Sequence, residues 1–317
     1  MKLFLTGLNS FLSQSLVNRL GDTEHSVSGS IRPSSTFKSS IVENITQNEL
    51  LPDENWAEAM FGVDVVIHTA ARAHILHEIA ADPLKEYRNI NTISTLRLAK
   101  QAAEAGASRF IFISSIGVNG NSNKHAFNEL NKPAPKEPYA ISKYEAEQGL
   151  LDIAEETGME VVIIRPPLVY GPGVKANFLS MIKWVDRSVP LPFGAIDNQR
   201  SLVALDNLVD FIIHCIDHPK AANEIFLISD GEDVSTTQLL IKVAVAFGRR
   251  PRLISVPVSW MKFIAKLLGK QAVTERLFSS LQVDSSKARE LLGWQPVTTM
   301  DEQLTKTIDA YLNEKTV

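Results

Sequence analysis

The stretch that decides the fold is MKLFLTGLNSFLS, residues 1–13. It passes from a short apolar run through Thr6 and Gly7 into a segment with helical spacing. A strand, a tight glycine turn and a helix N-terminus in this order are typical of the first unit of a parallel α/β sheet. Backbone N–H groups and the helix dipole at such a turn can hold a pyrophosphate. The residues expected in this phosphate cradle are Gly7, Asn9, Ser10, Phe11 and Leu12.

The glycine pattern of this turn is incomplete. The dinucleotide-binding fingerprint has glycine at three places, and here Ser10 and Ser13 occupy the second and third. Serine is small, and its hydroxyl could itself donate to a phosphate. An ordinary strand-to-helix turn explains these residues equally well, so the motif gains weight only from the rest of the chain.

Outward from this turn, short runs rich in Val, Ile and Phe alternate with longer segments of helical period. We expect strands near residues 2–6, 25–31, 63–69, 109–114 and 160–165, and helices near 11–20, 54–60, 84–105 and 137–157. This alternation predicts a doubly wound parallel sheet, the Rossmann type of α/β fold.

Beyond about residue 170 the order becomes mixed, with shorter strands and several prolines. Helices are expected there near 206–217, 235–247, 257–268 and 300–313. We therefore expect residues 1–170 to form mainly a dinucleotide-binding domain. Residues 171–317 would form mainly a smaller C-terminal α/β substrate-binding lobe, interleaved with the first domain.

Composition narrows the class of protein. The 317 residues are 44% hydrophobic and 21% charged, with a formal net charge of −4, as in ordinary globular proteins. With no basic block, the chain has no electrostatic footprint for nucleic acid or an anionic membrane. The single cysteine, Cys215, excludes an internal disulfide and a cysteine-based zinc site, and we expect no metal. The apolar run before Gly7 is too short for a signal peptide, and no integral membrane segment is expected, so we predict a cytoplasmic protein.

The second predicted strand ends at Ile31 and is followed by Arg32, with no carboxylate at its tip. Sites that prefer NAD usually place Asp or Glu there, where it accepts from the ribose 2′-hydroxyl. Arg32 could instead pair with the 2′-phosphate of NADP. A solvated loop arginine is the alternative interpretation.

Ser115, Tyr139 and Lys143 are the candidate catalytic residues. Ser115 follows an apolar run that ends at Ile113, and Tyr139 and Lys143 share one face of a predicted helix. Because an unperturbed tyrosine has a pKa of about 10, a tyrosine base needs nearby positive charge, which Lys143 and an oxidised nicotinamide would supply. A second Tyr-x-x-x-Lys, from Tyr311 to Lys315, shows that the spacing alone is weak, whereas only the first copy has a strand-end serine upstream.

Taken together, these motifs resemble the extended short-chain dehydrogenases, the NAD(P)-dependent epimerase and dehydratase family. The resemblance covers nearly the whole chain. Its matching stretches are Thr6 to Leu12, Val65 to Arg72, Asn91, Ser114-Ser115, Tyr139 to Lys143, Arg165 to Gly173, Val283 to Lys287 and Leu292 to Trp294.

The resemblance implies further site residues that spacing cannot show. Ala70 and Ala71 would pass beside an NAD or NADP cofactor, Asn91 would lie close to it, and Pro167 and Leu168 would flank its nicotinamide. Asn177, Arg200 and Arg276 would contact the diphosphate of a sugar nucleotide. For Arg200 this role also fits the fork-like grip of a guanidinium on phosphate. The alternative for each is a loop residue that only packs or caps.

The resemblance further implies a reaction. Tyr139 would take a proton from the 4-hydroxyl of the sugar, and Ser115 would hydrogen-bond the reacting oxygen, so that a 4-keto sugar forms. We expect a 4-epimerase that acts on a UDP-linked hexose or N-acetylhexosamine, in polysaccharide biosynthesis and as a homodimer. An NADPH-dependent reductase of 4-keto sugars and a non-catalytic dinucleotide sensor remain the alternatives. Dehydration is not expected, because Ile116-Gly117 stand where dehydratases carry Asp-Glu.

Overall fold

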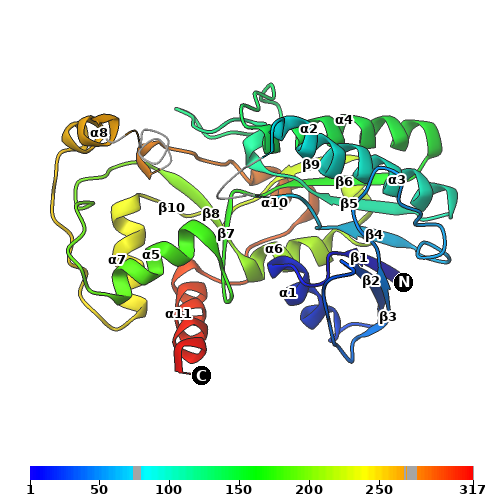
Figure 1. Cartoon of the computed structure of the whole chain (residues 1–317), viewed down its shortest axis with the longest axis horizontal. Coiled ribbons are helices and arrows are strands. Elements are labelled where there is room, and N and C mark those ends of the chain that lie inside the picture. The colour runs from blue at the N-terminus through cyan, green and yellow to red at the C-terminus, as the bar shows by residue number, and fades with distance from the viewer. Residues whose placement is uncertain (74–79, 268, 270–276, 317) are drawn as a thin grey trace.

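The computed structural model describes residues 1–73, 80–267, 269 and 277–316. Its centre is a seven-stranded sheet in the order β3-β2-β1-β4-β5-β6-β9, and all neighbouring strands are parallel (Figure 1). The predicted doubly wound sheet is confirmed. The strands are β1 (Lys2–Thr6), β2 (Ser26–Ile31), β3 (Val42–Gln47), β4 (Val65–His68), β5 (Arg109–Ile113), β6 (Glu160–Arg165) and β9 (Glu224–Leu227).

Helices cover both faces of this sheet (Figure 1). One face packs against α1 (Phe11–Leu20), α6 (Leu205–His214) and α10 (Ser286–Leu292). The other packs against α3 (Ser94–Glu104) and α4 (Pro138–Thr157). Strands buried on two sides need apolar residues at successive positions, which explains the continuous run Val65-Val66-Ile67 and its neighbours.

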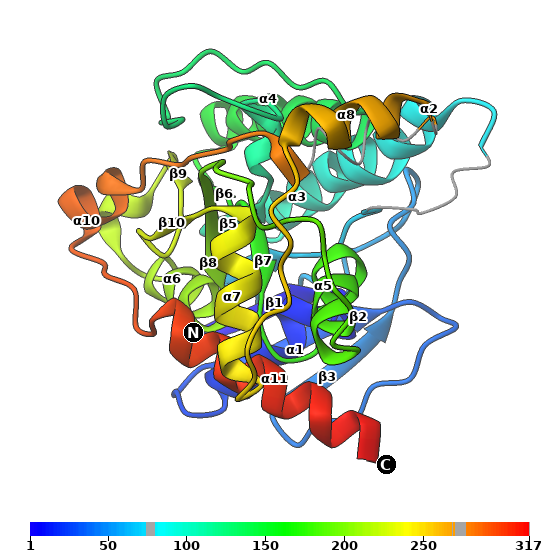
Figure 2. The same cartoon turned by 90° about the vertical axis from the view of Figure 1, so that its left-hand side faces the viewer.

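A smaller unit lies beside the carboxyl ends of the strands. Its three-stranded sheet has the order β10-β8-β7, formed by β7 (Leu168–Tyr170), β8 (Arg200–Ala204) and β10 (Asp233–Val234). The helices around it are α5 (Ala176–Asp186), α7 (Thr236–Ala246) and α11 (Met300–Thr316). Helix α8 (Val258–Leu267) lies at the outer end of this unit (Figure 2).

The chain does not keep its two halves apart. After building β7 and β8 it returns to the large sheet, where β9 pairs with β6 and becomes the outermost strand. Residues after position 200 therefore complete the sheet that begins at Lys2.

Three local expectations need correction. The helix predicted near 54–60 is wrong, because this segment forms turns. Its Trp56 is fully buried, with its ring packed against Phe4. The backbone N–H of Trp56 donates to Gln101 Oε1 at 2.6 Å, so tertiary contacts override the helical spacing. The helix predicted over 84–105 is divided into α2 (Pro83–Tyr87), a π-helical turn (Arg88–Ile93) and α3.

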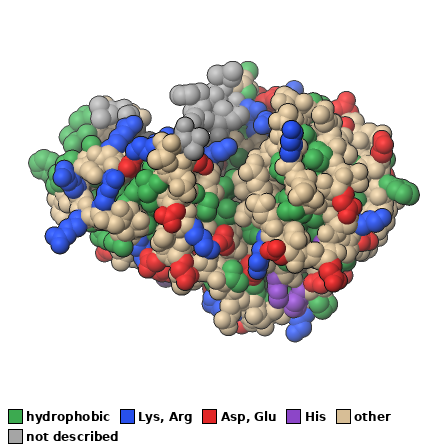
Figure 3. Space-filling model, turned by 90° about the horizontal axis from the view of Figure 1, so that it is seen from below, with side chains coloured by type: hydrophobic (Ala, Val, Ile, Leu, Met, Phe, Trp, Pro, Cys, Tyr) green, Lys and Arg blue, Asp and Glu red, His purple; other side chains and the backbone are tan. Residues whose placement is uncertain are grey.

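The third correction concerns β3, which the sequence did not reveal. Most of its side chains are exposed or half-buried, so it lacks the apolar run of the inner strands. Seen from below, acidic and basic side chains are interspersed over much of the surface (Figure 3). Among the helices that the structure describes, none is long and apolar enough to cross a membrane.

Candidate active site

The turn between β1 and α1 holds the predicted phosphate cradle. Gly7 has a φ of +67°, and a Cβ at this position would lie 2.9 Å from the Cβ of Ala70. Glycine is therefore required both by the backbone and by the close approach of the segment after β4. Ala70 and Ala71, predicted beside the cofactor, are half-buried in that segment.

Backbone donors in this turn fit a pyrophosphate. Ser10 caps α1, and within the described chain the N–H groups of Asn9, Phe11 and Leu12 have no hydrogen-bond acceptor. Such donors at a helix start are what a phosphate needs. The cradle therefore fits a dinucleotide despite its missing glycines.

The hydroxyls of Ser10 and Ser13 form hydrogen bonds within the protein. Ser10 Oγ accepts from the Ser13 N–H at 3.1 Å and donates to Ser13 Oγ at 3.0 Å. The buried Ser13 hydroxyl in turn lies 2.6 Å from Thr69 Oγ1. The Ser13 hydroxyl thus joins the end of β1 to the segment after β4.

Arg32 and Asn91, two further residues predicted at the cofactor, lie on different elements. Arg32 directly follows β2 and is exposed, with Ile31 as the last residue of the strand. Asn91 is buried in the π-helical turn, where its Oδ1 accepts from the Arg72 N–H at 2.8 Å and its Nδ2 donates to the Arg72 carbonyl at 3.0 Å. Nδ2 also donates to Ser142 Oγ, so Asn91 fixes the loop after β4 against α4.

The three candidate catalytic residues come from the end of β5 and the start of α4. Ser115 follows β5, and its Oγ accepts from the Gly117 N–H at 3.1 Å. A Cβ built on Gly117 would lie 3.3 Å from both Ser115 Oγ and the Cβ of Ala140, the neighbour of Tyr139. Lys143 Nζ donates to the carbonyl of Ile113 at 2.8 Å. These contacts bring the two segments that carry the three groups together.

The pKa values show how burial acts on this pair. Burial, followed by the nearby Tyr87 ring, raises the pKa of Tyr139 to about 12. Burial also lowers the pKa of Lys143 to about 7, against the opposing pull of Glu147. Lys143 Nζ lies 4.3 Å from the centre of the Phe112 ring, an apolar setting for an ammonium. The burial of Lys143 thus works against the positive charge that is expected, together with an oxidised nicotinamide, to favour the Tyr139 phenolate.

The residues predicted for the substrate lie on the smaller unit. Asn177 is exposed in the first turn of α5, and Arg200 begins β8, where its Nη1 donates to the Ser279 carbonyl at 3.1 Å. Pro167 is buried and Leu168 is 44% exposed, at the point where β6 leads into β7. Arg276 lies outside the described residues.

Comparison with known proteins gives the family. The family model described as the NAD dependent epimerase/dehydratase family matches residues 3–229. The chain belongs to this family. The resemblance inferred from the motifs is thereby confirmed.

Individual relatives of this epimerase/dehydratase-family chain agree with that result. It is 42% identical to a UDP-glucose 4-epimerase of Vibrio cholerae, over 98% of this chain and 95% of that protein. The crystal structure of UDP-glucose 4-epimerase from Thermotoga maritima superimposes with a TM-score of 0.80 at 23% identity, covering 99% and 100% of the two chains. UDP-glucuronic acid 4-epimerase from Bacillus cereus also reaches 0.80, at 20% identity and 99% coverage of both.

A buried polar network behind the site was not predicted. Glu147 lies one helical turn after Lys143 on α4, and its carboxylate pairs with the Arg165 guanidinium at 2.5 Å, both fully buried. Ser114 donates to Glu147, and Arg165 donates to Asn119 Oδ1 at 3.0 Å. The network ties β5, β6 and α4 together directly beside Ser115. Its only signal in the sequence was the i, i+4 spacing of Lys143 and Glu147.

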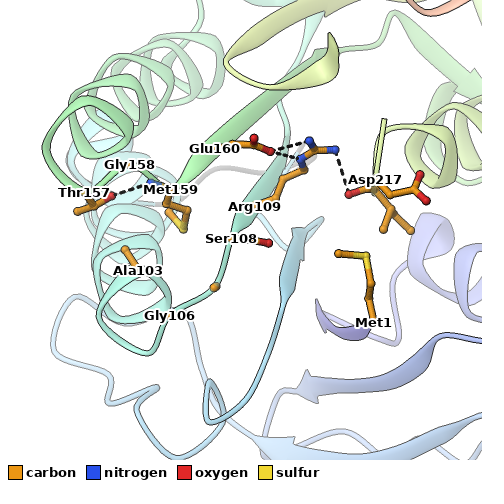
Figure 4. Close-up of a pocket in the computed structure, with 12 residues that line it drawn as sticks. Met1, Ala103, Gly106, Ser108, Arg109, Thr157, Gly158, Met159, Glu160 and Asp217 are labelled. Carbon is orange, nitrogen blue, oxygen red and sulfur yellow. Dashed lines mark hydrogen bonds and ion pairs between the residues drawn. The ribbon is translucent and has the colours of Figure 1, made fainter. Parts of the chain in front are cut away.

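A hollow at the opposite end of the sheet has no part in this site. It has a volume of about 530 Å³ and is lined by Met1, Ser108, Met159 and other residues at the amino ends of the strands (Figure 4). Its buried Arg109 is fully engaged by Glu160 and by the carbonyls of Cys215 and Ile216. The catalytic candidates all lie at the carboxyl ends.

In this family member, Lys143 is expected to titrate near pH 7 rather than near its usual 10.5. Its folded pKa is depressed by burial, so the unfolded chain binds the proton more tightly between about pH 7 and 10.5, and stability contributed by this residue rises with pH across that window. The midpoint can be read from the ¹³Cε shift in lysine-labelled protein, with Lys143→Met to assign the signal. A midpoint above pH 10 would contradict the burial argument.

Proposed function

We propose that the chain is an NAD-dependent 4-epimerase of a UDP-linked hexose or N-acetylhexosamine, working through a 4-keto sugar. The observation that carries this proposal is the 42% identity to a UDP-glucose 4-epimerase over 98% of the chain. The close approach of the Ser115 segment to the start of α4 supports it, because this approach brings Ser115 near the helix turn that carries Tyr139 and Lys143.

In this proposal the side chains have distinct tasks. Tyr139 takes the proton of the sugar 4-hydroxyl and returns one when the 4-keto sugar is reduced on its other face. Ser115 donates a hydrogen bond to the reacting oxygen, and Lys143 supplies positive charge when protonated. A bound NAD supplies the hydride acceptor and, when oxidised, a further positive charge beside the phenol. Since Tyr139 alone has a pKa of about 12, it needs both charges to act as a base near neutrality.

The remaining predicted residues would hold the ligands. The turn of Gly7, Asn9, Ser10, Phe11 and Leu12 would bind the pyrophosphate of NAD through its backbone. Ala70, Ala71, Pro167 and Leu168 would line the cofactor, and Asn91 would keep the Arg72 loop in place. The residues proposed for the UDP diphosphate are Asn177, Arg200 and Arg276.

The test is a turnover assay with purified protein. We expect interconversion of UDP-glucose and UDP-galactose, or of their N-acetyl counterparts, with no net consumption of cofactor. Oxidation of one NADPH for each product from a 4-keto sugar nucleotide would instead establish the reductase. Binding of NAD with no turnover of either pair would support the sensor.

Arg32 yields a prediction on the choice of cofactor. Replacing Arg32 by Glu removes a partner for a 2′-phosphate and adds repulsion, so the ratio of NADP to NAD affinity should fall by about tenfold or more. Titration calorimetry with both dinucleotides measures this ratio, and Lys38→Glu, in the same exposed loop, is the control. An unchanged ratio would mean that Arg32 does not contact the 2′ position.

We further propose a homodimer that works in the cytoplasm. The helices expected at its interface are those near 84–105 and 137–157, which lie together as α3 and α4 on one face of the sheet. Sedimentation velocity tests the oligomeric state.

A further inference from the structure

Helix α8 carries an apolar face that no part of the described chain covers. Trp260, Phe263, Ile264 and Leu267 are 69%, 62%, 50% and 71% exposed. In a protein whose other large apolar side chains are mostly buried, four such neighbours on one helix mark an interaction surface. The helix stands at the outer end of the smaller unit in both views (Figures 1 and 2).

The four side chains form one stripe. Their spacing of i, i+3, i+4 and i+7 puts them on a single side of the helix. The side that faces the protein is a different one, formed by the buried Met261 and Ala265. The stripe can therefore be covered from outside without unpacking α8.

The segment that carries this stripe is rich in basic residues. The segment from Val234 to Leu267 contains no Asp or Glu, and its basic residues are Lys242, Arg249, Arg250, Arg252, Lys262 and Lys266. Lys242 pairs with Glu232 and Asp301, and Arg249 pairs with Asp186. The other four are exposed, and within the described residues they have no ion pair.

The charge pattern separates two possible occupants of the stripe. A symmetric contact between two copies would place the same patch on both sides, so that one basic surface would face another. Like charges opposed in this way are unfavourable. An anionic bilayer surface complements both features, because lipid headgroups attract the cations while apolar side chains enter the interface. Ten residues of helix are too short to span a bilayer but suffice to lie in its surface.

We propose that α8 docks the protein on an anionic lipid surface, with Trp260, Phe263, Ile264 and Leu267 in the headgroup region and Lys262, Lys266, Arg250 and Arg252 against the lipid phosphates. This surface could not be recognised from the net charge, which is negative for the whole chain. Its basic residues are spread over a long segment of the sequence. The docking is independent of turnover, so it stands or falls separately from the epimerase activity.

The first test is vesicle flotation of the full chain. Unmodified protein should float with vesicles of phosphatidylcholine and phosphatidylglycerol, and much less with phosphatidylcholine alone. Trp260→Ser with Phe263→Ser, and separately Lys262→Glu with Lys266→Glu, should each lower binding by about tenfold or more. Phe61→Ser removes another side chain that is 89% exposed, far from α8, and should bind as the unmodified chain does. Circular dichroism shows that each variant is folded.

The second test uses fluorescence. Trp260 is the most exposed of the four tryptophans, since Trp56 and Trp294 are buried and Trp184 is half-buried. Mixed vesicles should shift its emission to shorter wavelength, and Trp260→Phe should abolish the shift. Absence of flotation, or equal flotation of folded Trp260→Ser/Phe263→Ser protein, overturns the proposal. So does an oligomer that these substitutions split without any vesicle binding, which would make the stripe a self-association face.

Discussion

Tyr139→Phe is expected to lower kcat by about a hundredfold to ten-thousandfold, with folding and NAD binding nearly unchanged. The substitution removes only the hydroxyl that is proposed to exchange a proton with the substrate. The ring is expected to keep its edge-to-face contact with Tyr87, whose centre lies 6.2 Å away. Initial rates of epimerisation at saturating UDP-sugar measure the loss, and calorimetry measures the retained binding of NAD.

The chain supplies a matched control for this experiment. Tyr311 and Lys315 repeat the Tyr-x-x-x-Lys spacing on α11, but both donate to the carboxylate of Asp186 on the smaller unit. Tyr311→Phe should therefore leave kcat within about twofold of the unmodified chain, since it removes one hydrogen bond near the surface. Turnover of Tyr139→Phe within tenfold of the unmodified chain would show that another group is the base.

Arg165→Met is expected to lower the free energy of unfolding by about 3–5 kcal/mol. The change leaves the fully buried Glu147 carboxylate without the Arg165 guanidinium, and among the described residues only the hydroxyl of Ser114 still donates to it. Such an uncompensated charge is far more costly than the loss of the pair as a whole. Urea denaturation followed by circular dichroism measures the difference.

Two controls isolate the buried charge. Glu147→Gln combined with Arg165→Met removes both charges and should recover much of the lost stability. Arg88→Met breaks a comparable Arg–Glu pair with Glu145, but because these side chains are 46% and 32% exposed, its loss of stability should be far smaller. Equal losses at Arg88 and Arg165 would mean that the burial of Glu147 has no energetic weight.

The parallel sheet was predictable because inner strands such as β4 and β5 are buried on both faces and contain unbroken runs of apolar residues. β3 was not, because an edge strand with polar side chains has no such pattern. The helix expected near 54–60 failed for a related reason. The apolar residues of this segment bury Trp56 instead of forming a helix face. The backbone N–H of Trp56 donates to the side chain of Gln101 on α3 and not to a carbonyl within a helix.

For the candidate active site, the spacing of residues in the sequence predicted which segments meet. It did not predict the pKa values or the hydrogen-bond partners of their side chains. Ser115 and the start of α4 come together as expected from a strand end and a helix face. The lowered pKa of Lys143 comes from its burial in the folded chain, and the Ser13 hydroxyl is engaged by Thr69. Both effects depend on segments that are distant in the sequence, so only the folded chain could reveal them.

The return of the chain to form β9 bears on how such genes can recombine. An exchange near codon 170 would join one parent's β6 to an outermost strand inherited from the other, where Ile164 must match Phe226 in register. A shortened product that stopped there would bare the backbone of β6 and invite edge-to-edge aggregation. Sugar specificity in this lineage should therefore diversify by substitutions within loops rather than by the swapping of whole halves.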